Sequence, residues 1–202
     1  LKTNVAYDIY KSLYGRGGCM RVTQTNFTVQ SQWTNLPKVS EWDSPQTLIL
    51  AFCSPDFLNK PEPIQYLKTQ YPSSIIVGCS TSGEIQGDAL SDSSIVVSFS
   101  RFEATHLVVA NAPILNPEDS EKVGHDLAQQ LIRESQLKGA LILTDGLNTN
   151  GSKLIAGFNK GIGSLQIPIG GGLAGDGNNF LKTFVVHDGK IKASCCLAVG
   201  FY

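Results

Sequence analysis

The sequence has 202 residues, which allows one large domain or two small ones, with a substantial buried core. Its 16 basic and 17 acidic residues leave a net charge of −1, which excludes a general electrostatic nucleic-acid binder and gives no support for a basic membrane-binding surface. A hydrophobic content of 42% is that of a folded domain and not of a disordered tail. We therefore expect partners other than nucleic acid or membrane.

The N-terminal stretch lacks a clear structural pattern. It has no apolar segment typical of a secretory signal, and the single methionine of the chain is Met20. We predict that residues 1–29 are a leader, whose first 19 residues are either native or an addition, and that the domain spans residues 30–202.

The first half of the domain combines strands, one helix and a glycine-containing loop. Continuous apolar runs predict buried strands, and Pro61 suits the start of a helix. In chain order the expected elements are a strand over 47–53, a polar turn over 54–56, a helix over 61–70, a strand over 74–77, a loop over 78–84, and strands over 94–99 and 105–110.

A helix over 117–136 is expected next, with Asn116 at its N-cap and Pro117 in its first turn. The second half then repeats the pattern of the first. Its elements are a strand over 140–144, a helix around 154–162, a strand over 166–169, a loop over 170–176, a hairpin turning at Asp188-Gly189, and a strand over 196–201.

Equivalent positions in the two halves are 92 to 102 residues apart. Gly78, Gly83 and Glu84 correspond to Gly170, Gly175 and Asp176. We predict an α/β fold of mixed sheets covered by helices, with two repeated β-α-β-β(-β) units over about 46–110 and 139–202 in a pseudo-twofold relation. The second unit stops at Tyr202, before its last expected strand.

The cysteines are predicted to be free, buried thiols. Their number is odd, and none forms a C-x-x-C pair that would suit zinc or thiol–disulfide chemistry. Two adjacent cysteines on one strand point to opposite faces. Together with the lack of a signal peptide, this favours a reducing compartment, the cytoplasm. The five are Cys19, Cys53, Cys79, Cys195 and Cys196.

The two loops are the candidate ligand site, because loops at the carboxyl ends of sheet strands commonly bind ligands. Small hydroxyls and free backbone N–H groups suit a polar pocket, although the same groups can simply satisfy tight turns. Likewise, Glu84 and Asp176 can meet as an acid–base pair or accept N–H bonds in separate turns. The candidates are Gly78, Cys79, Ser80, Thr81, Ser82, Gly83, Glu84, Asp145, Gly171, Gly172, Ala174, Gly175 and Asp176.

Known catalytic motifs fit these loops poorly. The spacing around Ser80 is one residue too long for a nucleophile elbow, and Cys79 directly follows a buried strand, which favours a structural thiol. The glycines at 170–175 match G-x-G-x-x-G but continue into a turn and a strand, whereas a dinucleotide site needs a helix there. We expect no enzyme, with a Cys79 or Ser80 hydrolase as an alternative.

Several of these segments resemble the FIST N-terminal domain family, over roughly residues 30–202. They are Leu48 to Asp56, Ile76 to Ile85 (with its Gly-Cys-Ser-Thr-Ser-Gly-Glu run), and Ile167 to Asp176 with the hairpin at residues 187–189. The resemblance implies a bacterial sensory domain that binds a small ligand, with amino acids proposed, and that works beside a histidine kinase or a cyclic-di-GMP enzyme. In the family a C-terminal FIST domain normally follows, and we expect none within these 202 residues.

The resemblance also implies a haem alternative, because one branch of the family senses nitric oxide with haem. An axial ligand would have to be found among His106, His125 and His187, a cysteine or a tyrosine, and nothing in the sequence selects one.

Overall fold

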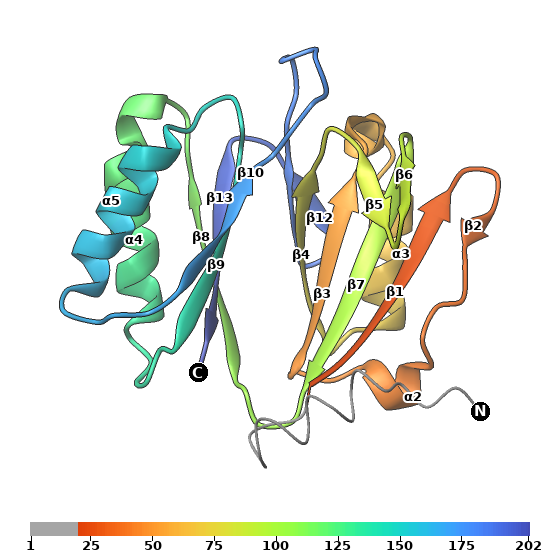
Figure 1. Ribbon diagram of the computed structural model, residues 1–202, viewed down its shortest axis with the longest axis horizontal. Helices are drawn as coiled ribbons and strands as arrows, with labels where there is room; N and C mark the ends of the chain where they lie inside the picture. The colour runs from red at the N-terminus through yellow and green to blue at the C-terminus, as the bar shows by residue number, and fades with distance from the viewer. Residues whose placement is uncertain (1–19) are drawn as a thin grey trace.

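The computed structural model describes residues 20–202, and these form four layers, with helices outside two sheets that face each other (Figure 1). The first sheet has the strand order β12 (Lys190–Lys192), β11 (Val185–His187), β4 (Ile75–Ser80), β3 (Thr47–Cys53), β7 (Ser94–Phe102), β1 (Met20–Thr28) and β2 (Gln32–Trp33). The second has the order β10 (Ile169–Leu173), β9 (Gly139–Thr144), β13 (Cys195–Phe201) and β8 (Leu107–Pro113). A small hairpin pairs β5 (Glu84–Gln86) with β6 (Ala89–Ser91).

Helices cover the outer faces of both sheets. On the first sheet lie the 3₁₀ helix η1 (Pro55–Asn59) and α3 (Glu62–Gln70), with the short α2 (Val39–Trp42) beside them. On the second lie α4 (Ser120–Leu131), which follows the 3₁₀ turn η2 (Pro117–Asp119), and α5 (Gly151–Ile162). The helix predicted over 117–136 is therefore shorter, and Gln136 has a φ of 69°, which a helix does not allow.

Three apolar cores separate the four layers. Ile49 and Phe99 pack with Ile64 beneath α3. Val77 faces Leu197 between the sheets. The third core joins the second sheet to α4 and α5. Strands that are buried on both faces are apolar at successive positions, which is why β3, β4 and β9 were predictable as continuous apolar runs.

Both sheets are mixed, as predicted for this α/β fold. In the first, β3 lies parallel to β4 and antiparallel to β7, which continues antiparallel to β1. In the second, β9 lies parallel to β10 and antiparallel to β13, which continues antiparallel to β8. The strand order thus agrees between the halves, while a duplication and a pseudo-twofold relation stay predictions.

Two strands lie elsewhere than the sequence pattern indicated. The strand expected to close the first unit, β8, belongs instead to the second sheet, where it pairs with β13. β1 lies within the stretch predicted as a leader, yet it pairs with β7 along all nine of its residues. Its sequence alternates polar residues with few large apolar ones, so it carries little signal of a buried strand.

The hairpin at Asp188-Gly189 forms as predicted, with φ values of 52° and 78° that suit a tight two-residue turn. β11 pairs with β4, so a hairpin from the second half of the chain extends the first sheet. The two halves are therefore interlocked.

The thiols of Cys53, Cys79, Cys195 and Cys196 are free and buried, as predicted, while Cys19 lies outside the described residues. Cys195 faces the core between the sheets and Cys196 the core beneath the helices, so the two do point to opposite faces. Within residues 20–202, no helix has the length and apolarity needed to cross a membrane.

Candidate functional site

The candidate site lies where the two sheets present the carboxyl ends of their parallel strands. β3 and β4 end at Cys53 and Ser80, and β9 and β10 end at Thr144 and Leu173. In Figure 1 the arrowheads of β3, β4 and β10 point to the same upper edge. The loops that leave these strands therefore lie together.

Two hydrogen bonds, both donated by backbone N–H groups, join the loops directly. The N–H of Gly175 donates to the carbonyl oxygen of Ser80 over 2.9 Å, and the N–H of Gly177 donates to Ser82 Oγ over 3.0 Å. A Cβ at position 175 would lie 2.5 Å from Ser82 Oγ, so the approach requires glycine there. The structure thus brings together residues 80–83 and 175–176, which the sequence had singled out separately, and adds Gly177.

A polar cavity of about 230 Å³ opens at this junction. The predicted residues Thr81, Gly83, Glu84 and Asp176 contribute to its wall. The other residues of the wall were not predicted from the sequence, although residues 54–56 were expected as a polar turn after a strand. The further wall residues are Ser54, Pro55, Asp56, Asp92, Ser93, Gly177, Asn179 and Lys182.

Glu84 is held by short local hydrogen bonds. Its Oε1 accepts from Thr81 Oγ1 over 2.8 Å, and its Oε2 accepts from the hydroxyl of Ser94 over 2.9 Å. Only 1% of the residue is exposed. Burial raises the pKa of the Glu84 carboxyl, and the hydrogen bonds from Thr81 and Ser94 offset part of that rise.

Asp176 uses one oxygen for its own loop. Oδ2 accepts the backbone N–H groups of Leu181 and Lys182 over 2.9 and 2.8 Å. Burial pushes the pKa of Asp176 upward, but these two N–H donors, together with the Asn179 side chain and the charge of Lys182, bring the pKa below its ordinary value. The other oxygen, Oδ1, is shielded from solvent but has no hydrogen-bond partner among residues 20–202. Only 5% of the residue is exposed.

Asp145 lies at the end of β9 and caps the following turn. Its Oδ1 accepts the N–H groups of Leu147 and Asn148, and its Oδ2 accepts from the hydroxyl of Thr183. It does not contribute to the wall of the polar cavity. Asp145, expected among the ligand-site residues, instead caps this turn.

Several candidates lie within strands and not in loops. β4 continues through Gly78, Cys79 and Ser80, all of them buried. Burial raises the pKa of Cys79 to about 12, and Ser80 Oγ accepts the N–H of Phe184. Because a protonated thiol and an engaged, buried hydroxyl are poor nucleophiles, this geometry gives no support to the hydrolase alternative.

β10 likewise continues through the expected glycine loop. Gly171 and Gly172 pair with β9 and line a different cavity, of about 340 Å³, beside Leu154 and Ile155 of α5. Ala174 packs in the core between the sheets. The loop of the second half therefore begins at residue 174.

The three histidines lie apart from the cavities described here. His106 and His125 are exposed, and His187, in β11, lies 3.3 Å from the Nζ of Lys192. None of the three lines the cavities described here. Across the described part of the chain, no three His, Cys, Asp or Glu side chains gather into a possible metal site.

This geometry defines a class of protein: an α/β sandwich with a polar cavity between two glycine-containing loops. The model of the FIST N domain family matches residues 47–202, so the chain belongs to this family of sensory and signal-transduction domains. A comparison with curated proteins finds no match.

Proposed function

We propose that this chain is a non-catalytic sensory domain that binds a small amine-bearing ligand, a free amino acid in the simplest case, in the cavity between its two loops. The observation that carries the proposal is the buried, unpartnered Oδ1 of Asp176 at the wall of this cavity. A rotation of the carboxylate would present it to an ammonium group. Buried polar atoms are normally paired, and a ligand donor would supply the missing partner.

The charges around the cavity favour such a ligand. Asp56, Glu84, Asp92 and Asp176 line it, against the single Lys182. An excess of carboxyl groups attracts an ammonium, and Lys182 can pair with the carboxylate of an amino acid. The proposal places the domain in the cytoplasm, where it passes the binding signal to a partner such as a histidine kinase or a cyclic-di-GMP enzyme.

Thermal unfolding with amino acids and their decarboxylated amines tests this function. A ligand at 100 times its dissociation constant stabilises by about 2.7 kcal/mol, which raises the Tm of a chain of this size by about 5–10 °C. Asp176→Asn, whose amide oxygen can still accept the loop N–H groups, should lose most of this shift. Asp126→Asn, on the exposed face of α4, should keep it.

Lys182→Met provides a second variant, in which the substituted residue is exposed. It should bind amino acid and amine equally well, whereas the unmodified chain should prefer the amino acid. The proposal fails if no amine-bearing compound raises the Tm, or if Asp176→Asn folds and responds as strongly as the unmodified chain.

A further inference from the structure

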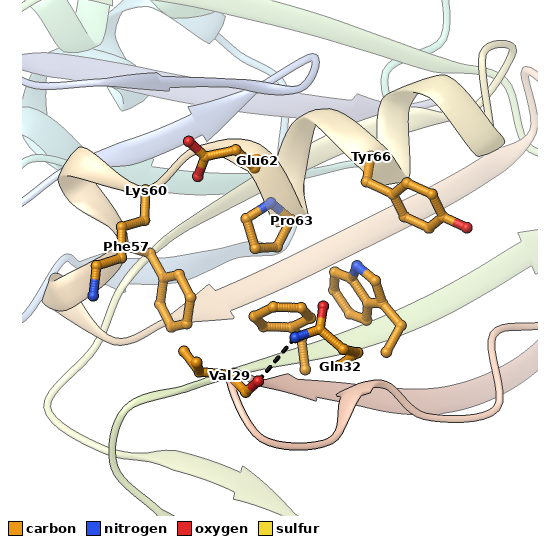
Figure 2. Close-up of a pocket in the computed structure, with 9 residues that line it drawn as sticks. Val29, Gln32, Phe57, Lys60, Glu62, Pro63 and Tyr66 are labelled. Atoms are coloured by element: carbon orange, nitrogen blue, oxygen red, sulfur yellow. Dashed lines mark hydrogen bonds between the residues drawn. The ribbon is translucent and has the colours of Figure 1, made fainter.

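A larger cavity, of about 590 Å³, lies on the outer side of the first sheet, away from the loop junction. Its walls come from the β1–β2 hairpin on one side and from η1 and α3 on the other (Figure 2). Pockets of about 300–1,000 Å³ with mostly apolar walls are typical sites for small organic molecules. The function proposed above does not use this cavity.

The walls of this cavity are aromatic and held in place. The ring of Phe27 packs against Trp33 at 5.3 Å between centroids and against Phe57 at 5.8 Å, nearly edge to face. Pro63 and Tyr66 of α3 complete the opposite wall (Figure 2). Fixed aromatic edges and faces favour a flat aromatic guest, because ring contacts add to simple apolar burial.

One polar group in this wall lacks an acceptor. The indole Nε1 of Trp33 is shielded from solvent and has no partner within residues 20–202. The neighbouring Gln32 does not accept from it, and its side-chain Nε2 donates instead to the carbonyl oxygen of Val29 over 2.8 Å (Figure 2). Buried indole N–H groups usually find an acceptor, and this one, on a residue that lines the cavity, is left without one among the residues described.

The mouth of the cavity carries one positive and one negative side chain. Lys60 and Glu62 are exposed at its edge, and neither takes part in an ion pair within the described part of the chain. A cationic or an anionic guest meets one attractive and one repulsive charge there, so the pair favours neither sign. The indole N–H needs only an acceptor, which an uncharged polar group supplies.

We propose that this cavity is a second ligand site, which binds an uncharged aromatic molecule of one or two rings through its carbonyl oxygen. A small turn of the Trp33 indole brings its N–H to this oxygen, while the guest ring packs among Phe27, Phe57 and Pro63. The site is separate from the loop cavity, since η1 lies between them: Asp56 lines one and Phe57 the other.

Nuclear magnetic resonance of the ¹⁵N-labelled full chain tests this directly. The chain has two tryptophans, so Trp33→Phe and Trp42→Phe assign the two indole N–H signals. Benzamide and acetophenone should move the Trp33 signal downfield in a saturable way and leave the Trp42 signal in place. Toluene, which lacks an acceptor, should not produce the downfield shift. Trp33→Phe should weaken benzamide binding about fivefold, the loss of one hydrogen bond.

Two matched variants locate the bound probe. Val29→Phe fills the mouth of the cavity and should abolish binding, whereas Val22→Phe, on an equally exposed valine outside the cavity, should bind normally. Asp176→Asn should also bind benzamide normally, which separates this site from the amine site. The inference is overturned if the Trp33 signal does not respond, if Val29→Phe binds as well as Val22→Phe, or if Asp176→Asn loses binding.

Discussion

At the scale of single residues, Glu84 makes the stability of the folded protein depend on pH. Its carboxyl group is buried at 1% exposure, and burial raises its pKa in the folded protein. The folded state therefore holds the proton more tightly than the unfolded state, whose glutamate pKa is about 4.3. The stability that this group contributes is present below about pH 4 and is lost as the pH rises through the raised folded pKa.

Glu84→Gln imitates the protonated form and should reveal this loss. We expect the free energy of unfolding of Glu84→Gln to improve relative to the unmodified chain as the pH rises from 4 to 7, measured by urea unfolding at each pH. Glu62→Gln, on the exposed start of α3, is the matched control for replacing a carboxylate outside the loop junction. A trend in the opposite direction would mean that the hydrogen bonds from Thr81 and Ser94 outweigh burial.

At the scale of elements, α4 and α5 pack at a distance that glycine sets. A Cβ at Gly157 would overlap the carbonyl oxygen of Glu121, and one at Gly124 would overlap the carbonyl oxygen of Leu154. Alanine is favoured over glycine within a helix by about 1 kcal/mol. Here the obstacle is backbone, which cannot turn away as a side chain can, so the two helices would have to move apart.

Gly157→Ala should therefore destabilise the protein by about 1–3 kcal/mol, the usual cost of overpacking, in spite of its better helix propensity. Asn159→Ala, an exposed position on the same helix, isolates the propensity effect and should be neutral or slightly stabilising. Urea unfolding of both variants gives the comparison. A more stable Gly157→Ala would show that the helices are not in tight contact.

The elements that sequence could predict are those whose signal is local. Continuous apolar runs located β3 and β9, and the Asp188-Gly189 turn located the hairpin. β1 was missed because pairing with β7, and not its own composition, makes it a strand. The loops of the candidate site were recognised but begin later than expected, because glycines within β4 and β10 pair in the sheets and do not end the strands.

The residues that the β3 and β7 ends contribute to the polar cavity could not be found from sequence. Asp56 follows β3 and Asp92 precedes β7, and only the pairing of these two strands places them beside the loops. The same holds for the aromatic cavity, where Trp33 and Pro63 lie 30 residues apart in the chain and meet through the packing of α3 on the first sheet.

At the scale of the whole molecule, the sheets depend on each other. The core between them draws Val77 and Cys79 from the first and Leu143 and Leu197 from the second. The β11–β12 hairpin, which lies between β10 and β13 in the chain, completes the first sheet by pairing with β4. Neither half can keep its full set of hydrogen bonds and buried surface when the other unfolds, so unfolding should be a single cooperative step.

Phe158→Ala tests this cooperativity because the reporter lies far from the mutation. Phe158 is fully buried on the inner face of α5, and both tryptophans, Trp33 and Trp42, pack on the outer side of the first sheet. Removing the ring should cost about 3–5 kcal/mol. In one cooperative unit, tryptophan fluorescence and far-ultraviolet circular dichroism should show the same lowered urea midpoint. If the halves unfolded separately, the fluorescence midpoint would stay where it is in the unmodified chain while the dichroism split into two steps.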